Sequence, residues 1–261
     1  MSRWGVFKAI WGAYGRTLLL VAVIVGSLTL LGLVVLSPPS RMGNVPFEGW
    51  YGNWGSVVLA TVLFLAFLLG FARPKRRPEW RGAGLYTAFL ISLFAEMFGI
   101  PLTLYLLSPF LGLSPRTFGL HESHLWAYLL SQLGVVPLAQ GVYGVMVLSV
   151  GLIALGVILV ALGWHRVYRG EGKLVTDGIY GYLRHPQYLG LILIVVAFNI
   201  QWPTLPTLLL APILIVMYIR LAWAEERELE ERFGEAYRAY RRQVPRFWPW
   251  RWGGKGGLSR P

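Results

Sequence analysis

The chain has 261 residues, of which 56% are hydrophobic and only 14% charged, whereas a soluble globular domain usually carries about a quarter charged residues. This balance excludes most soluble enzymes and all disordered chains, and the mean hydropathy of +0.55 indicates a protein that lies in lipid. The formal net charge of +12 would suggest a nucleic-acid partner in a soluble protein, and the lack of cysteine excludes disulfides, thiolate metal sites and a cysteine nucleophile.

Several apolar stretches predict membrane-spanning helices, because a bilayer core needs roughly 20 apolar residues per helix. In chain order they are Thr17–Leu36, Trp54–Phe71, 84–107, 142–163, 189–200 and 205–219. The stretch 189–200 is short for a span, so we interpret it with 205–219 as a tight helical hairpin whose first arm begins near Pro186. Together the stretches predict an all-α, polytopic membrane bundle of about six transmembrane helices.

The distribution of basic residues predicts the orientation of these helices, because cytoplasmic loops collect Lys and Arg. If the N-terminus is cytoplasmic, 22 of the 24 basic residues fall on the inner side, and only Arg41 and Arg116 fall outside. Six crossings with both termini in the cytoplasm are therefore expected. The positive charge is then a topology signal, and no nucleic-acid partner is predicted.

A first polar segment, residues 174–190, follows the fourth predicted span. His185-Pro186 should start a helix, because proline suits the first helical position. This places Arg184, His185 and Tyr188 around a helix N-terminus at the membrane surface, where free N–H groups and the helix dipole favour an anionic ligand group. The alternative interpretation is an interfacial anchor without a ligand.

A second polar segment, residues 224–245, follows the hairpin and predicts a cytoplasmic amphipathic helix. Its apolar face is formed by Leu229, Phe233, Tyr237 and Tyr240. Glu225 lies one turn before this face and is expected to point toward the core, where a carboxylate needs a partner; a cationic ligand is one candidate. Glu226 lies about 100° further round the helix and is expected to face water.

The two segments occur in this order around an apolar hairpin, and over roughly residues 150–250 they resemble the isoprenylcysteine carboxyl methyltransferase and phospholipid methyltransferase family. The resemblance rests on Leu174-Val175, Gly178-Ile179-Tyr180, Arg184-His185-Pro186-Gln187-Tyr188, Glu225-Glu226 and Val244-Pro245. It implies an integral membrane enzyme that uses S-adenosylmethionine. Position by position, it implies cofactor contacts from Leu174, Val175, Tyr180, His185, Pro186, Gln187, Tyr188 and Glu225.

Further candidate residues follow from the chemistry of the cofactor and of the acceptor. Arg184, or the helix start near His185, is suited to hold the carboxylate of the cofactor. For an amine acceptor, His185 or Glu226 would be the first general bases to examine. In the family an Arg linked to the substrate precedes the Glu pair; Leu221 stands there in this chain, which makes the preceding Arg220 a candidate substrate contact. His165 stands where the prenylcysteine enzymes have a cofactor-contacting Gln.

The predicted function is methyl transfer from S-adenosylmethionine to a lipid-like or membrane-embedded acceptor at the cytoplasmic face. The acceptor stays open between a phospholipid amine, a prenylcysteine carboxylate, a small thiol and another lipid, and the oligomeric state is not predicted. A transporter or a non-catalytic membrane protein of the same fold is the rival from another class. Residues 1–140 are expected to form a membrane scaffold, 141–250 the core with the cofactor site, and 251–261 a basic flexible tail.

Three polar features of the predicted scaffold call for separate interpretations. Glu96 is an ionisable residue inside a span, hence either functional or a cap for backbone groups freed by Pro101. His121 and His124 have a loose metal-ligand spacing, but an outer loop or helix cap is favoured and no metal site is predicted. The basic cluster at 73–81 is interpreted as a contact with anionic lipid.

Overall fold

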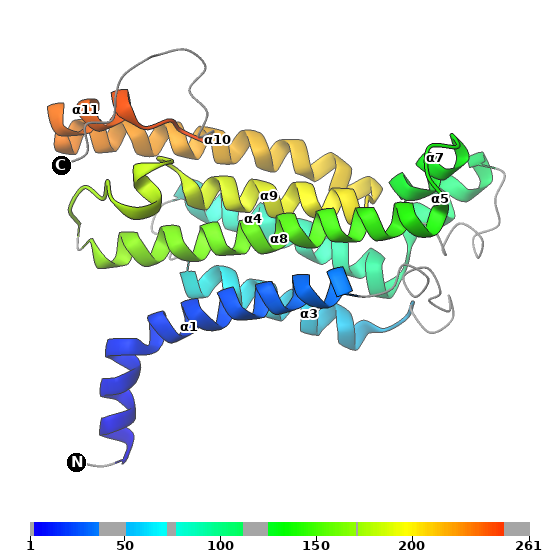
Figure 1. The fold of residues 1–261 in the computed structure, drawn as a ribbon, viewed down its shortest axis with the longest axis horizontal. Coiled ribbons are helices and arrows are strands. Elements are labelled where there is room, and N and C mark those ends of the chain that lie inside the picture. Colours follow the sequence, from blue (N-terminus) through cyan, green and yellow to red (C-terminus); the bar gives the residue numbers. More distant parts are fainter. Residues whose placement is uncertain (1–2, 37–50, 72–76, 112–124, 171, 248–261) are drawn as a thin grey trace.

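A computed structural model describes residues 3–36, 51–71, 77–111, 125–170 and 172–247, and the regular elements in these ranges are helices (Figure 1). They are α1 (Arg3–Leu36), α3 (Trp54–Phe71), α4 (Arg77–Phe94), η2 (Ala95–Gly99), α5 (Leu102–Leu111), α7 (Leu125–Gln132), α8 (Leu138–Arg169), η3 (Gly178–Gly181), α9 (Pro186–Gln201), α10 (Leu205–Phe233) and α11 (Glu235–Gln243). The prediction of an all-α helical bundle is confirmed.

Four helical segments are long and apolar enough to cross a membrane, and two shorter helices are apolar as well. The four are Thr17–Leu36, Arg81–Gly99, Leu138–Arg169 and Leu205–Phe233, and the shorter ones are Trp54–Ala66 and Pro186–Gln201. All six predicted stretches therefore correspond to helices of an integral membrane protein. As expected for the hairpin, its first arm begins at Pro186.

The third predicted span, 84–107, is wrong in its extent. The α-helix passes into the short π-helix η2, which ends at Gly99, and α5 starts anew at Leu102. Pro101 causes the break, because proline has no N–H to donate and forces the preceding residue out of the helical region. Ile100 accordingly adopts an extended conformation, with φ −117° and ψ 113°.

Glu96 caps the backbone at this break. Its Oε2 accepts a hydrogen bond of 2.9 Å from the backbone N–H of Thr103, one of the groups that the break leaves without a helical partner. The Thr103 hydroxyl in turn accepts a 2.9 Å bond from the backbone N–H of Leu205, at the start of α10. This geometry agrees with the structural interpretation of Glu96, which here ties the α4–α5 break to the hairpin.

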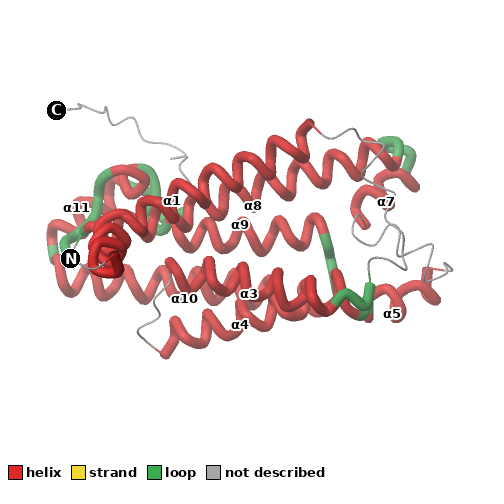
Figure 2. Tube along the Cα trace, turned by 90° about the horizontal axis from the view of Figure 1, so that it is seen from below, coloured by secondary structure: helices red, strands yellow, loops and turns green. Residues whose placement is uncertain are grey.

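Helices α8 and α9 pack with their backbones in close contact (Figures 1 and 2). A Cβ built on Gly156 of α8 would lie only 2.6 Å from the carbonyl oxygen of Gly190 in α9, and one built on Gly163 would touch Pro186 and Gln187. Small residues at a helix crossing allow this approach in membrane proteins. The crossing fixes the start of α9, where the first polar motif lies, against the end of α8.

The polar segments gather at one end of the long axis. In Figures 1 and 2 α11 lies at the same end as the beginning of α1, whereas α5 and α7 lie at the opposite end. His121, His124, the 251–261 tail and part of the 73–81 cluster fall outside the described residues.

Candidate functional site

The first polar motif folds as a loop held against the end of α8. Gly178 has φ +58°, a value that suits glycine and allows the turn into η3. The Tyr180 hydroxyl donates to the side-chain oxygen of Gln187 at 3.0 Å, and the Tyr240 hydroxyl donates to the carbonyl of Tyr180 at 2.7 Å. Gln187 and the backbone of Tyr180 thus stabilise the conformation of the loop through hydrogen bonds.

A second contact to this motif comes from residues 244–246, here called the 244–246 strap. The backbone N–H of Arg184 donates to the carbonyl of Pro245 at 3.0 Å, and that of His185 donates to the carbonyl of Arg246 at 3.2 Å. The strap follows α11, which Gly234, with φ +54°, turns back beside α10. The apolar face predicted for the second segment is therefore shared by two helices, and its tyrosines pack together with Leu174.

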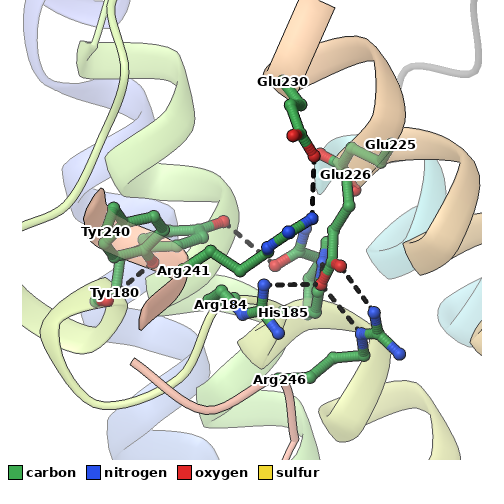
Figure 3. Close-up of polar contacts among 10 residues, drawn as sticks. Tyr180, Arg184, His185, Glu225, Glu226, Glu230, Tyr240, Arg241 and Arg246 are labelled. Atoms are coloured by element: carbon green, nitrogen blue, oxygen red, sulfur yellow. Dashed lines mark hydrogen bonds and ion pairs between the residues drawn. The ribbon is translucent and has the colours of Figure 1, made fainter. Parts of the chain in front are cut away.

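The prediction for the two neighbouring carboxylates is reversed in the structure. Glu226 points inward, with a side chain only 5% exposed, whereas the Glu225 side chain is 38% exposed. The cause is Arg246 of the strap, whose guanidinium forks onto Glu226, with Nε 2.8 Å from Oε1 and Nη2 bonded to Oε2 (Figure 3). Buried charges are tolerated when they are paired and hydrogen-bonded in this way.

His185 lies between the two carboxylates. Its Nε2 is 3.1 Å from Glu226 Oε1, and its Nδ1 is 3.4 Å from Glu225 Oε2. Burial alone would lower the pKa of His185, but the two carboxylates outweigh it and raise the pKa above its usual range. Protonated His185 can direct one ring N–H at each carboxylate, so it links the buried Glu226 to the more exposed Glu225.

A cavity of about 390 Å³ opens beside these residues, between the 172–184 loop, the end of α10 and α11. This volume lies within the range of roughly 300–1,000 Å³ that is typical of small-molecule sites. Its lining residues are Val167, Tyr168, Gly172, Lys173, Leu174, Val175, Tyr180, Arg184, Glu225, Leu229, Arg232, Phe233, Tyr237 and Tyr240. Five predicted cofactor contacts are thus brought together: Leu174, Val175, Tyr180, Arg184 and Glu225.

Four other predicted contacts do not line the cavity. His185 reaches it only through Glu225, and Pro186 and Gln187 are buried against Gly163 of α8. The Tyr188 ring lies 5.7 Å from the His185 ring and 6.0 Å from the ring of Tyr218.

Arg220, the candidate substrate contact, is not brought to this site. It is exposed on α10 and does not line the cavity. Because each helical residue rises about 1.5 Å, Arg220 also lies roughly 9 Å along the axis from Glu226.

Several polar atoms at the cavity have no hydrogen-bond partner among the described residues. They are Nε and Nη1 of Arg184, Oε2 of Glu225 and the hydroxyl of Tyr237. The Arg184 side chain is only 10% exposed, and its Nη1 lies 3.3 Å from Glu226 Oε1 without forming a hydrogen bond. Buried donors without acceptors are costly, so these groups are suited to a ligand that brings an anionic and a cationic or hydroxyl group.

Several residues at this site or beside it were not predicted from the sequence, among them four with polar side chains. Lys173, Arg232 and Tyr237 line the cavity, and Arg246 holds Glu226. Burial, together with the nearby Glu226 carboxylate, raises the pKa of Tyr237 to about 12, so its hydroxyl stays neutral. A sequence signal existed for Arg246: Pro245 ends α11, so the following residue can turn back toward the bundle.

These observations define a class of protein: a helical membrane protein with a pocket of small-molecule size, lined by both polar and apolar side chains, at one end of its bundle. Residues 139–236 match the sequence model of the phospholipid methyltransferase family. Over 73 residues the chain is 37% identical to the protein-S-isoprenylcysteine O-methyltransferase of Schizosaccharomyces pombe. The segment from α8 to the start of α11 is therefore similar to these methyltransferases, which supports the resemblance.

Both comparisons concern only part of the chain. The match to the yeast protein covers 28% of this chain and 31% of that relative, so the chain spans about a third of the relative's length. No solved structure matches. The matched family segment contains every residue that lines the cavity except Tyr237 and Tyr240, and the 244–246 strap also lies beyond it.

Proposed function

We propose that this protein is an S-adenosylmethionine-dependent methyltransferase that acts on a membrane-embedded, lipid-like acceptor at the cytoplasmic face. The observation that carries the proposal is the cavity, where two motifs far apart in sequence meet and leave hydrogen-bonding groups of Arg184 and Glu225 without partners. Residues 1–140 would serve as a scaffold, and the site would belong to the part from residue 141 onward.

The lining residues fit the parts of this cofactor. Arg184 would bind the carboxylate through its unpaired donors, and Glu225 would accept hydrogen bonds from the amine or from ribose hydroxyls. Leu174 and Val175 offer an apolar wall for the adenine. The faces of Tyr180 and Tyr240 can stabilise a cation.

When bound, the cofactor supplies an electrophilic methyl group on a sulfonium. The chain's own contribution is to orient the two reactants and exclude water. His185 and Glu226, the candidate bases for an amine acceptor, are engaged with each other and with Arg246. This pairing favours an acceptor that needs no deprotonation, such as a carboxylate or a thiolate.

Binding of the cofactor is the first test. The protein in lipid nanodiscs is titrated with S-adenosylmethionine by calorimetry, and the wild type should bind. Arg184→Met and Glu225→Gln should weaken binding by about 10- to 100-fold, because a hydrogen bond to a charged group contributes roughly 1.5–3 kcal/mol. Glu231→Gln is the matched control, since Glu231 is an exposed carboxylate on the same helix that does not line the cavity.

The acceptor class is the second test. The reconstituted protein is incubated with methyl-labelled cofactor and total lipid extract, and the labelled product is identified. Label in the lipid phase supports a lipid acceptor, and label in protein redirects the search to a protein carboxylate. If a folded wild type neither binds the cofactor nor transfers label, the proposed function is wrong.

A further inference from the structure

Arg246 does not line the cavity and lies beyond the segment that matches the family, yet its strap contacts Arg184, His185 and Glu226, here called the polar cluster. Its guanidinium forks onto both oxygens of Glu226, and its Cζ lies 5.6 Å from the centre of the Trp223 ring. The backbone of the same strap accepts hydrogen bonds from Arg184 and His185. Arg246 is therefore fixed to the cluster through both main chain and side chain.

A continuous series of side chains leads from Arg246 to the cavity (Figure 3). Glu226 Oε1 accepts from Arg246 Nε at 2.8 Å and lies 3.1 Å from His185 Nε2, and His185 Nδ1 lies 3.4 Å from Glu225 Oε2. Glu225 lines the cavity. A shift of Glu226 therefore changes the position of the His185 imidazole, and through it the contact with Glu225.

Glu226 is also a potential competitor for the pocket's free donors. Its Oε1 lies 3.3 Å from Arg184 Nη1, although the two form no hydrogen bond. Without the guanidinium of Arg246, Oε2 of this buried carboxylate would lose its hydrogen-bond donor. His185 already contacts Oε1, and Arg184 is the nearest remaining arginine. The fork thus keeps Nε and Nη1 of Arg184 available to a ligand.

We propose that Arg246 is a positioning residue of the pocket: by holding Glu226, it keeps His185 directed at Glu225 and leaves Nε and Nη1 of Arg184 without a hydrogen bond, so that they can bind an anionic group of the cofactor. This inference rests on the proposed function. It assigns a role to a part of the chain, the 244–246 strap, that lies outside the family match.

The test is a mutant cycle in lipid nanodiscs, read by calorimetry with S-adenosylmethionine. Arg246→Met should raise Kd by about 10- to 100-fold, the loss that outer-shell partners typically cause at metal ligands. Glu226→Gln and the double variant should show the same loss, because they interrupt the same series of contacts. Arg242→Met is the matched control and should bind normally, since its ion pair with Glu235 is exposed.

A second measurement reports on the geometry itself. Carbon-13 NMR of labelled histidine follows the titration of His185, one of four histidines in the chain, with His185→Gln for assignment. The charged and titratable groups around this ring are Glu225 and Glu226 of α10, Arg184, Tyr188 of α9 and Arg246 of the strap. Arg246→Met removes a positive charge and should raise the pKa of His185, whereas Glu226→Gln removes a negative charge and should lower it.

The outcomes separate this inference from the function on which it rests. If the wild type does not bind the cofactor, the proposed function fails and the inference falls with it. If the wild type binds but Arg246→Met has the same Kd, or if the losses of the cycle add, the positioning role alone is wrong. Should Arg246→Met not fold, Arg246→Lys decides, because a lysine keeps the charge without the fork; its Kd should rise at least about threefold, and an unchanged Kd overturns the role.

Discussion

The crossing of α8 and α9 carries the site, so a single methyl group added there should disturb both stability and binding. In Gly156→Ala the new Cβ would lie 2.6 Å from the Gly190 carbonyl oxygen and 2.8 Å from Cγ1 of Ile194. The first contact is with backbone, which cannot rotate away, so the two helices must separate. The same helix offers a control in Gly144, where an added Cβ would meet nothing within 4 Å.

The size of the effect follows from two opposing terms. Overpacking typically costs about 1–3 kcal/mol, and replacing a helical glycine by alanine recovers up to about 1 kcal/mol. Gly156→Ala should therefore lose roughly 1–2 kcal/mol of the free energy of unfolding, whereas Gly144→Ala should lose none. At about 2–4 °C per kcal/mol for a chain of this size, the two melting temperatures should differ by several degrees.

Thermal unfolding of both variants in the same lipid nanodiscs measures this difference. The affinity for S-adenosylmethionine should fall in Gly156→Ala as well. A shift of α9 moves its N-terminal end, where His185 is the N-cap and Pro186 the first helical residue. Equal melting temperatures for the two variants would refute the reasoning, since the crossing would then tolerate a methyl group that the backbone contact excludes.

Three further outcomes are expected. The neighbouring carboxylates raise the pKa of His185, so the stability that its protonation contributes is present below about pH 6.5 and is lost as the pH rises through the higher folded-state pKa. The difference in melting temperature between wild type and His185→Gln should therefore shrink from about pH 6 to about pH 9. A difference that stays constant over this range would contradict the prediction. Glu96→Leu should lower the free energy of unfolding by about 1–3 kcal/mol, because it leaves the backbone N–H of Thr103 unpaired. Glu96→Gln keeps an acceptor and should lower it by less than about 1 kcal/mol. Loss of methyl transfer in a stable Glu96→Gln variant would instead indicate a functional role. Since the chain has no cysteine, the single-cysteine variants Gln243→Cys and Leu133→Cys can each be labelled with an impermeant maleimide. In right-side-out vesicles only Leu133→Cys should react. Labelling of Gln243→Cys alone would overturn a cytoplasmic site.

The fold was predictable because the spans depend on a local property. A helix that crosses lipid must be apolar over most of its length, and this can be read from composition alone. The end of the third span was not predictable from composition, because membrane helices also tolerate proline within a continuous span. Glu96 and Thr103 satisfy the backbone at the break, and only the structure brings these two residues together.

The sequence predicted some of the residues that line the cavity, but not their geometry. The motif residues Leu174, Val175, Tyr180, Arg184 and Glu225 all line one cavity. Which of two adjacent glutamates points inward was not predictable, because helical periodicity places a side chain relative to its own helix only. The outcome was decided by a cation that returns to the helix from 20 residues further along the chain.

The orientations of the two glutamates, Glu226 inward and Glu225 toward the cavity, account for the electrostatics of the pocket. Glu226, in contact with Arg246, Arg184 and His185, acts as the counter-ion of the protein's own cations. Glu225 has only His185 as an ionic partner among the described residues and lines the cavity together with Lys173, Arg184 and Arg232. The cavity thus presents one carboxylate and three cations, a set that can bind a zwitterionic amino-acid group with its acid toward the arginines and its amine toward Glu225. Had Glu226 faced water, as periodicity suggested, Arg184 would have lost its buried counter-ion inside the protein.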